Sequence, residues 1–147
     1  MGIRGLNSES EVRVVASHVG AGTSNYTATP VDMQGFEGVR FIIPISTSAN
    51  TASVIATFGE GASTSAFTTL SGTSVSHTGT ATAVSKVMLC DIYRPKDRYI
   101  QATITRATAN ASVGAITAEL YGESKLSTTN STAYGVSDTD TVFSPST

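Results

Sequence analysis

The sequence contains no tryptophan, one cysteine and two histidines, and charged residues make up only 14% of its 147 residues. A single cysteine cannot form a disulfide within the chain. Cys90 lies in an apolar stretch, which favours a buried small side chain over a reactive thiol. Because no CxxC, HxH or HExxH spacing is present, neither a metal centre nor a nucleophilic active site is predicted. We expect no cofactor and no enzymatic activity.

Long hydrophobic runs and an excess of basic residues are also missing. No stretch approaches the roughly 20 apolar residues of a membrane-spanning helix, and the first residues lack the pattern of a signal peptide. The formal net charge is −2, whereas nucleic-acid binding normally requires a basic patch. We therefore expect a protein that is made in a cytoplasm, is not exported by a cleaved signal, and contacts neither nucleic acid nor a membrane.

The sequence is rich in small polar residues and in residues that favour β-strands. Serine and threonine account for 43 residues and glycine for 13; threonine favours strands, whereas serine and glycine favour turns. Several short strands at regular spacing predict an all-β fold, either a β-sandwich or a jelly roll of antiparallel strands, with a closed barrel as the alternative. We expect a flexible lead-in over 1–10, a single β-sandwich domain over 11–125, and a Ser/Thr-rich tail or arm over 126–147, so that both termini are extended.

The most ordered pattern spans Lys86–Arg106, KVMLCDIYRPKDRYIQATITR. Lys86–Tyr93 is rich in apolar and β-branched residues, and the residues from Tyr99 onward alternate with period 2, as a half-buried strand requires. The intervening segment Arg94–Asp97 contains the proline of a type I or type II turn. This pattern predicts a β-hairpin.

A second hairpin is predicted from Val39–Ser46 and Ala52–Gly59, which are joined by a five-residue connection. In the first of these strands, alternate apolar residues beginning at Val39 share one face. Pro44 lies in the opposite phase and cannot donate a ladder hydrogen bond, which places it at a sheet edge or a bulge.

Other segments carry weaker patterns. Glu11–Val19 is predicted to be the first strand and Ala115–Ser124 the last, while Asn25–Met33 is expected to be an edge strand or a strand broken by Pro30. Ala107–Gly114 is expected to be a turn-rich connection.

Both faces of the Lys86–Tyr93 strand are apolar, because Val87 and Leu89 lie on one face and Met88, Cys90 and Ile92 on the other. In a two-layer sandwich only one face of each sheet meets the other sheet. The second apolar face therefore predicts a contact with another subunit, and we expect a homo-oligomer.

The charged turn at Arg94, Lys96, Asp97 and Arg98 has two interpretations. It is either a solvated hairpin tip with an Asp–Arg pair, which contributes little at the surface, or a docking tip that makes charge-assisted contacts to an acidic partner. The tail that follows residue 125 has spaced aromatic residues, among them Tyr134 and Phe143. It is predicted to be flexible, or to be an arm that is ordered only when it docks on a neighbour.

Three segments resemble small structural proteins of tailed bacteriophages, namely the head decoration or cement proteins. The segments are Val31–Ile43 (VDMQGFEGVRFII), Val87–Ile104 with its D-x-Y-R-P-x-x-R-Y core, and Gly114–Leu126, which ends in Y-G-x-x-K-L. The motifs are structural rather than catalytic. The Ser/Thr-rich tail and residues 61–85 match nothing in that family.

The resemblance implies a β-rich homotrimer that is made in the cytoplasm of the host bacterium and lies on the outer capsid surface of the virion. Its partner would be the major capsid protein, with adjacent subunits bridged so that the shell resists internal pressure. The expected capsid contacts are Arg94, Lys96, Asp97, Arg98, Tyr134 and Phe143.

A carbohydrate-binding or host-attachment module of a phage particle is the alternative, because jelly rolls also serve as lectin domains. Such sites usually expose aromatic residues that stack on sugars. The absence of tryptophan and the placement of most tyrosines in strands argue against this alternative.

Overall fold

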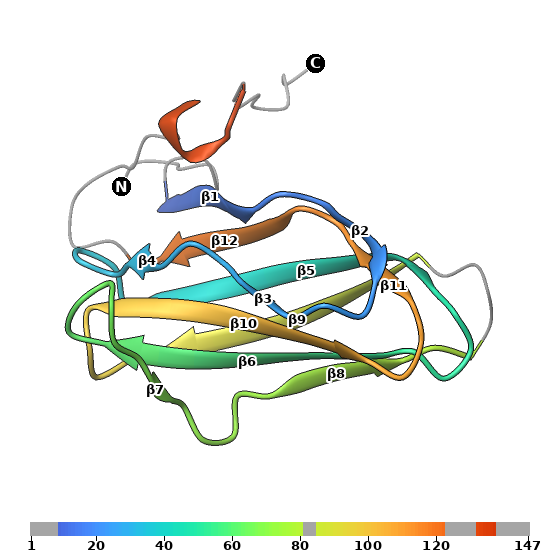
Figure 1. The fold of residues 1–147 in the computed structure, drawn as a ribbon. Helices are drawn as coiled ribbons and strands as arrows, with labels where there is room; N and C mark the ends of the chain where they lie inside the picture. The colour runs from blue at the N-terminus through green and yellow to red at the C-terminus, as the bar shows by residue number, and fades with distance from the viewer. Residues whose placement is uncertain (1–8, 81–84, 123–131, 138–147) are drawn as a thin grey trace, which may run out of the picture.

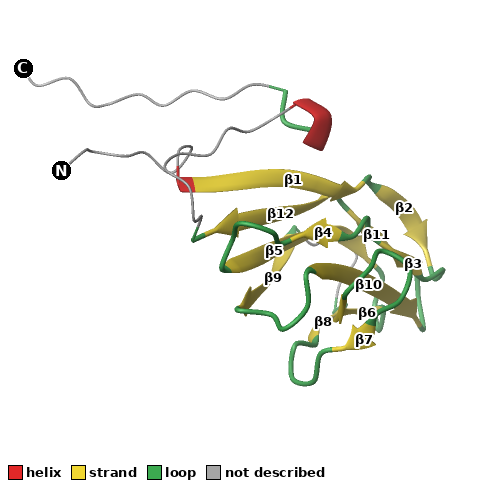
Figure 2. Cartoon of the chain, turned by 90° about the vertical axis from the view of Figure 1, so that its left-hand side faces the viewer, coloured by secondary structure: helices red, strands yellow, loops and turns green. Residues whose placement is uncertain are grey.

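The computed structural model describes residues 9–80, 85–122 and 132–137, which form two antiparallel sheets packed face to face (Figure 1). The predicted all-β sandwich of antiparallel strands is thereby confirmed. Figure 2 views the sandwich from its end and shows β1, β12, β5 and β9 in one layer, with β3, β10, β6 and β7 in the other.

The first layer, here called the β5 sheet, has six strands. β12 and β11 pair with successive parts of one edge of β5, and β9 pairs with the other edge. The strands are, in sheet order, β1 (Ser10–Ala16), β12 (Ile116–Tyr121), β5 (Gly38–Ser48), β11 (Ala111–Val113) and β2 (Val19–Gly22), with β9 (Lys86–Tyr93) beside β5.

The second layer, here called the β6 sheet, is built around a long central pair. The short strands β3 and β4 share one edge of β10, and β7 and β8 share the far edge of β6. The strands are β3 (Tyr26–Thr27), β4 (Val31–Asp32), β10 (Tyr99–Ala107), β6 (Ser53–Gly61), β7 (Thr68–Thr69) and β8 (Val75–Thr78).

The core lies between the two sheets and follows directly from the period-2 alternation of the long strands. Along most of β5, β6, β10 and β12 every second residue is apolar, and those apolar residues point inward with at most 1% exposure. The rings of Phe41 from β5 and Phe58 from β6 meet across the middle with their centroids 4.8 Å apart.

Both predicted hairpins are wrong. β9 pairs with β5, from Gly38↔Tyr93 to Ile45↔Lys86, whereas β10 pairs with β6, from Tyr99↔Gly61 to Ala107↔Ser53. In both cases the chain crosses from one layer to the other instead of pairing with its neighbour in sequence. The alternation of each strand is satisfied equally well by a neighbour in sequence or by a distant strand, so the pattern that revealed the strands did not reveal their partners.

Pro44 lies inside the central strand β5, at an irregularity rather than at a sheet edge. In a strand, the N–H and C=O of one residue point to the same side. The Pro44 carbonyl accepts from Gly114 N–H at 2.8 Å, so the missing N–H faces the junction of β11 and β12. The register of β11 against β5 shifts close by, between Ser112 and Val113. Pro44 therefore lies in an interior strand beside a bulge, and not at a sheet edge.

The segment 107–114 is more ordered than expected, because it contains β11, whose Ala111 and Val113 are fully buried. The predicted strand Glu11–Val19 is also divided, since β1 ends at Ala16 and β2 begins at Val19. The prediction for Asn25–Met33 is confirmed, with β3 and β4 on either side of Pro30 pairing with the same strand.

The described part of the C-terminal segment packs on the edge of the β5 sheet. It contains the short 3-10 helix η1 (Thr132–Tyr134), which contacts β1. Gly135, with φ of +87°, follows η1, and a Cβ there would lie 2.8 Å from Val14 Cβ. Residues 1–8, most of 126–147 and Phe143 lie outside the described residues. No helix in the described ranges is long and apolar enough to span a membrane.

Candidate functional site: a charged corner and an apolar sheet face

The predicted contact segment Arg94–Arg98 is a corner that carries the chain from β9 in one sheet to β10 in the other. Its first residue has a left-handed backbone, with φ of +52° at Arg94, a conformation that is uncommon for a residue with a side chain. Arg94 N–H donates to Glu37 O at 2.7 Å, and Met33 N–H donates to Arg98 O at 2.8 Å. The corner is therefore tied at both ends to the loop between β4 and β5.

That loop is itself a tight turn. Phe36 N–H donates to Met33 O at 3.0 Å, and Gly35 has φ of +90°, as the third position of a type II turn requires. The Asp32 carboxylate accepts from Gln34 N–H at 3.0 Å.

Two arginines of the corner are paired with this loop. Arg98 donates to both carboxylate oxygens of Asp32 at 2.8 Å, and Arg94 lies 3.4 Å from Glu37. The hydrogen bonds from Arg98 hold the pKa of Asp32 below its usual value. These acids come from the β4–β5 loop, so the Asp–Arg pair expected within the turn itself is not the pair that forms.

Glu60 on β6 holds the middle of the corner. Its Oε2 accepts from Lys96 N–H at 2.8 Å and from Asp97 N–H at 3.2 Å. A carboxylate bound by successive backbone N–H groups is a common anion-binding arrangement. Sequence reasoning missed Glu60, because it lies more than 30 residues from the corner and has no motif around it.

A depression of about 470 Å³ lies where the loop and the corner meet. Its lining is apolar at Met33, Phe36 and Pro95 and charged at Glu37 and along the corner. The side chains of Arg94 and Arg98 remain 69% and 47% exposed in spite of their ion pairs. The corner therefore presents fixed, accessible cationic groups.

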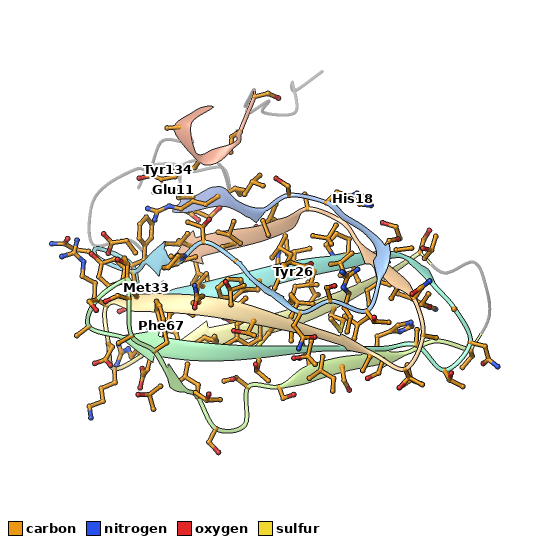
Figure 3. The ribbon with its side chains drawn as sticks, in the orientation of Figure 1. Glu11, His18, Tyr26, Met33, Phe67 and Tyr134 are labelled. Atoms are coloured by element: carbon orange, nitrogen blue, oxygen red, sulfur yellow. The ribbon has the colours of Figure 1, made fainter. Side chains whose placement is uncertain are left out.

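Tyr134 lies at the same end of the sandwich. Its ring centroid is 4.4 Å from the Arg13 guanidinium carbon, and Arg13 Nη1 donates to Asp32 O at 3.3 Å. Figure 3 shows Tyr134 beside Glu11, the acid that pairs with Arg13 at 3.0 Å. Two of the predicted contact regions, Tyr134 and the corner, are thus joined through Arg13 and Asp32. The proposed role of these residues in partner binding stays a prediction.

The outer face of the β5 sheet is a second candidate surface. Within the described residues, the exposed large apolar and aromatic side chains are Val14, Val87, Leu89, Tyr93 and Tyr134. The first four lie on this outer face, and Tyr134 lies on η1 beside it. The register places Val14, Thr117, Ile42 and Leu89 in one row across four strands. This confirms that β9 is apolar on both faces.

The next outward row along these strands is ionic. Arg40 lies between Glu119 on β12 and Asp91 on β9, and Arg40 Nη2 is 3.4 Å from Glu119. Tyr121 donates a short hydrogen bond to Asp91, and its ring covers Gly38 so closely that no Cβ would fit there. Burial, followed by this bond, raises the pKa of Tyr121. The outer face therefore combines an apolar row with a fixed polar row.

The described residues hold no catalytic constellation. Ser48 Oγ lies 3.1 Å from His77 Nε2, but Ser48 is fully buried and cannot meet a substrate. No group of three or more His, Cys, Asp or Glu residues in this part of the chain could hold a metal ion. Cys90 is buried, as predicted, and burial raises the pKa of its thiol.

Comparison with known proteins adds a distant structural likeness. No protein-family model matches the chain, and no curated protein matches it. Among solved structures, the chain is similar to Eiger TNF from S. frugiperda at 9% sequence identity and a TM-score of 0.32, over 74% of this chain and 92% of that one. At that TM-score the likeness says nothing about function.

Proposed function

We propose that this chain is a structural protein of a tailed bacteriophage, which decorates the capsid and bridges neighbouring major capsid subunits as a homotrimer. The resemblance of three segments to phage decoration proteins supports the choice of family. The observation in the fold that carries the proposal is the apolar outer face of the β5 sheet. Such a face offers a surface for assembly, as a structural protein requires.

The apolar face supports self-association on energetic grounds. Val87 and Leu89 are 54% and 51% exposed, so burial of the remaining exposed part of each side chain would contribute about 1 kcal/mol. Several of these residues on each copy favour association. Contiguous exposed apolar surface is unusual on a monomer and marks interaction sites.

The corner supports the second contact, which is with the capsid. Backbone bonds to Glu37, Glu60 and Met33 already fix the corner, so little conformational entropy is lost when a partner binds. Lys96 is exposed at its tip. A carboxylate on a capsid subunit would pair with Lys96 or replace Glu37 at Arg94.

The test is co-sedimentation of the purified protein with capsids that lack it, followed by heating. We expect saturable binding and a higher temperature of capsid disruption. A variant with Arg94→Ala, Lys96→Ala and Arg98→Ala should bind less, whereas Lys86→Ala, at the start of β9, should bind normally. Failure of the unmodified protein to sediment with capsids would refute the proposal; normal occupancy by the triple variant would refute only the role of the corner.

One observation favours the carbohydrate-binding alternative. The Tyr93 ring is 57% exposed, its hydroxyl lies 3.3 Å from Glu37, and Arg94 is stacked beside it with 5.3 Å between guanidinium carbon and ring centroid. An exposed aromatic ring next to a carboxylate is a common sugar-binding pair. A glycan array, with Tyr93→Ala as the control, distinguishes this function from capsid binding.

A further inference from the structure

β9 has a free backbone edge. In the part of the chain that the structure describes, β9 pairs only with β5 and is the last strand on its side of the sheet (Figure 2). The Pro44 carbonyl faces β11, so the backbone groups of the alternate residues in β5 face β9. Carried across the pairing, this phase directs the N–H and C=O groups of Val87, Leu89 and Asp91 away from β5. These three are here called the edge residues.

The two sides of the β5 sheet differ in how their edges are satisfied. On the far side, Thr29 N–H donates to Val15 O at 2.8 Å, and Arg106 Nη1 donates to Gly20 O at 2.7 Å. On the β9 side, no backbone group among the described residues bonds to the edge residues. The β9 side of the sheet is therefore open to another strand.

The edge of β9 also lacks the features that prevent strand addition. Proteins protect an exposed edge with proline, a bulge, a very short strand or a covering segment. β9 is eight residues long, contains no proline, and pairs with β5 without a break in register. The segment before β8 contacts an inward side chain, since Cys90 Sγ lies 3.4 Å from Thr73 O, but it makes no bond to the edge residues. An unprotected edge of this length is the kind of site to which extended peptides add as strands.

We propose that the free edge of β9 binds an extended segment of a partner protein as an added antiparallel strand. The side chains of the edge residues specify its chemistry. Val87 and Leu89 are more than half exposed, so apolar side chains fit opposite them. Asp91 is exposed, and its carboxylate accepts from Tyr121 but forms no ion pair within the described ranges. A lysine or arginine therefore fits opposite Asp91.

This inference concerns a backbone edge and does not depend on the proposed capsid function. An added strand lies beside β9 in the plane of the sheet. The outer face of the sheet then remains open to the proposed contact between copies, and the corner remains open to a capsid subunit.

A second copy of β9 is a poor occupant of this edge. Two antiparallel β9 strands pair only with outward residue opposite outward residue. In every such register that pairs at least three of Val87, Leu89, Asp91 and Tyr93, Asp91 faces a second Asp91, Val87 or Leu89. A like charge or an apolar side chain opposite Asp91 is unfavourable. Such a contact is also two-fold symmetric and generates a dimer, whereas the proposed assembly is a trimer.

The probe for this site is the peptide TVTKTVTVT with both ends blocked. In an antiparallel pairing its lysine lies opposite Asp91, and its second and third valines lie opposite Leu89 and Val87. N-methylation of the second valine removes an N–H that would bond to β9. N-methylation of the threonine before it removes an N–H that faces away from β9, which makes this second peptide the matched control.

Amide hydrogen exchange of the full-length protein, followed by NMR, measures the pairing. In the free protein the amides of Val87, Leu89 and Asp91 should exchange fast, whereas those of Met88 and Cys90, which face β5, should exchange slowly. The peptide at ten times its dissociation constant should slow the three edge amides about tenfold. The control peptide should do the same, and the peptide methylated at its second valine should not. Asp91→Lys should prefer a peptide with glutamate in place of lysine.

Three results would overturn the proposal. The first is fast exchange of the edge amides at millimolar peptide, or equal protection by both methylated peptides. The second is slow exchange in the free protein that becomes fast on dilution, which would assign the edge to a second copy. The third is slow exchange that neither peptide nor dilution changes, which would show that the chain covers its own edge. Capsid binding is not measured here, so the proposed function stands or fails separately.

Discussion

The outer faces of the two sheets differ although their inner faces are alike. The outer face of the β5 sheet carries Val87, Leu89, Val14 and Tyr93, each more than a third exposed. The outward residues of the two long strands in the β6 sheet are mostly polar: Ser53, Thr57, Gln101, Thr103 and Thr105. The large apolar or aromatic exceptions are Ile55 and Tyr99, and both are only partly exposed.

This difference separates what the fold requires from what the proposed assembly would use. The inner faces must both be apolar, because each covers the other and together they form the core. The outer faces are free of that constraint. Threonine and glutamine on one of them satisfy β-propensity without an apolar surface. The apolar row on the other is therefore not needed for the fold, which supports the proposed self-association.

The inner faces offer the largest expected effect. Phe41→Ala in the β5 sheet and Phe58→Ala in the β6 sheet should each lower the free energy of unfolding by about 3–5 kcal/mol, because each leaves a cavity at the same ring contact. Urea denaturation measures both. If one variant lowers the free energy of unfolding far less than the other, the two inner faces do not contribute equally to stability.

Arg106 should produce the next largest effect, because it joins the two sheets at the opposite end. It is 4% exposed, and its side chain donates to the carbonyls of Gly20, Ser24 and Ala111 at 2.7–2.8 Å. Arg106→Met retains the apolar stem but leaves three carbonyls without that donor. We expect the free energy of unfolding, measured by urea denaturation, to fall by about 3 kcal/mol.

The matched control for Arg106 is Arg98→Met at the exposed corner, where water can replace the lost bonds to Asp32. A much smaller loss is expected for this variant. Equal losses in the free energy of unfolding would show that the burial of Arg106 does not increase the contribution of its hydrogen bonds.

The outer faces are compared directly by placing a lysine on each. Leu89→Lys on the β5 sheet should raise the dissociation constant of the oligomer roughly tenfold or more, since it removes an apolar contact of about 1 kcal/mol in each copy and would place a charge in the interface. Thr57→Lys on the β6 sheet should leave it unchanged. Light scattering coupled to size-exclusion chromatography gives the molar mass at several concentrations. A loss of assembly in Thr57→Lys alone would transfer the interface to the other sheet.

The smallest effect concerns the exposed pair at the corner. Arg98 holds the pKa of Asp32 below its ordinary value of about 3.9. A pKa that is lowered in the folded state adds stability above the unfolded-state value, and this stability is lost as the pH falls through the folded-state value. Asp32→Asn and Arg98→Gln should both flatten the decline in stability below about pH 4.

Urea midpoints at pH 5 and pH 3 measure this decline. Arg94→Gln leaves the Asp32–Arg98 pair intact and should decline as the unmodified protein does. A decline in Asp32→Asn as steep as that of the unmodified protein would show that Asp32 contributes nothing to the pH dependence.

The positions of most strands could be predicted from the sequence, because alternation is a local property. Val39, Phe41, Ile43 and Ile45 are all buried, as their phase in the sequence indicated. The broken strand around Pro30 was also predictable, since proline cannot donate a ladder hydrogen bond. β11 was missed because Ala111–Val113 is too short to show a period.

The candidate site could be predicted only in part. Arg94, Lys96 and Arg98 were identifiable as a charged turn, and β9 as a strand that is apolar on both faces. Their ion-pair partners Asp32 and Glu37, and the anchoring Glu60, are distant in sequence, and nothing in the local pattern connects them.

The sequence by itself determined the class of the fold and the inward and outward sides of the long strands, because side chains alternate across a strand whatever its neighbours are. Only the tertiary structure decided which strands pair. The Arg94–Arg98 segment has the composition of a hairpin turn, yet it crosses between layers because β9 pairs with β5 and β10 with β6. Non-local backbone pairing, which leaves no mark on local composition, sets the corner and thereby the charged surface.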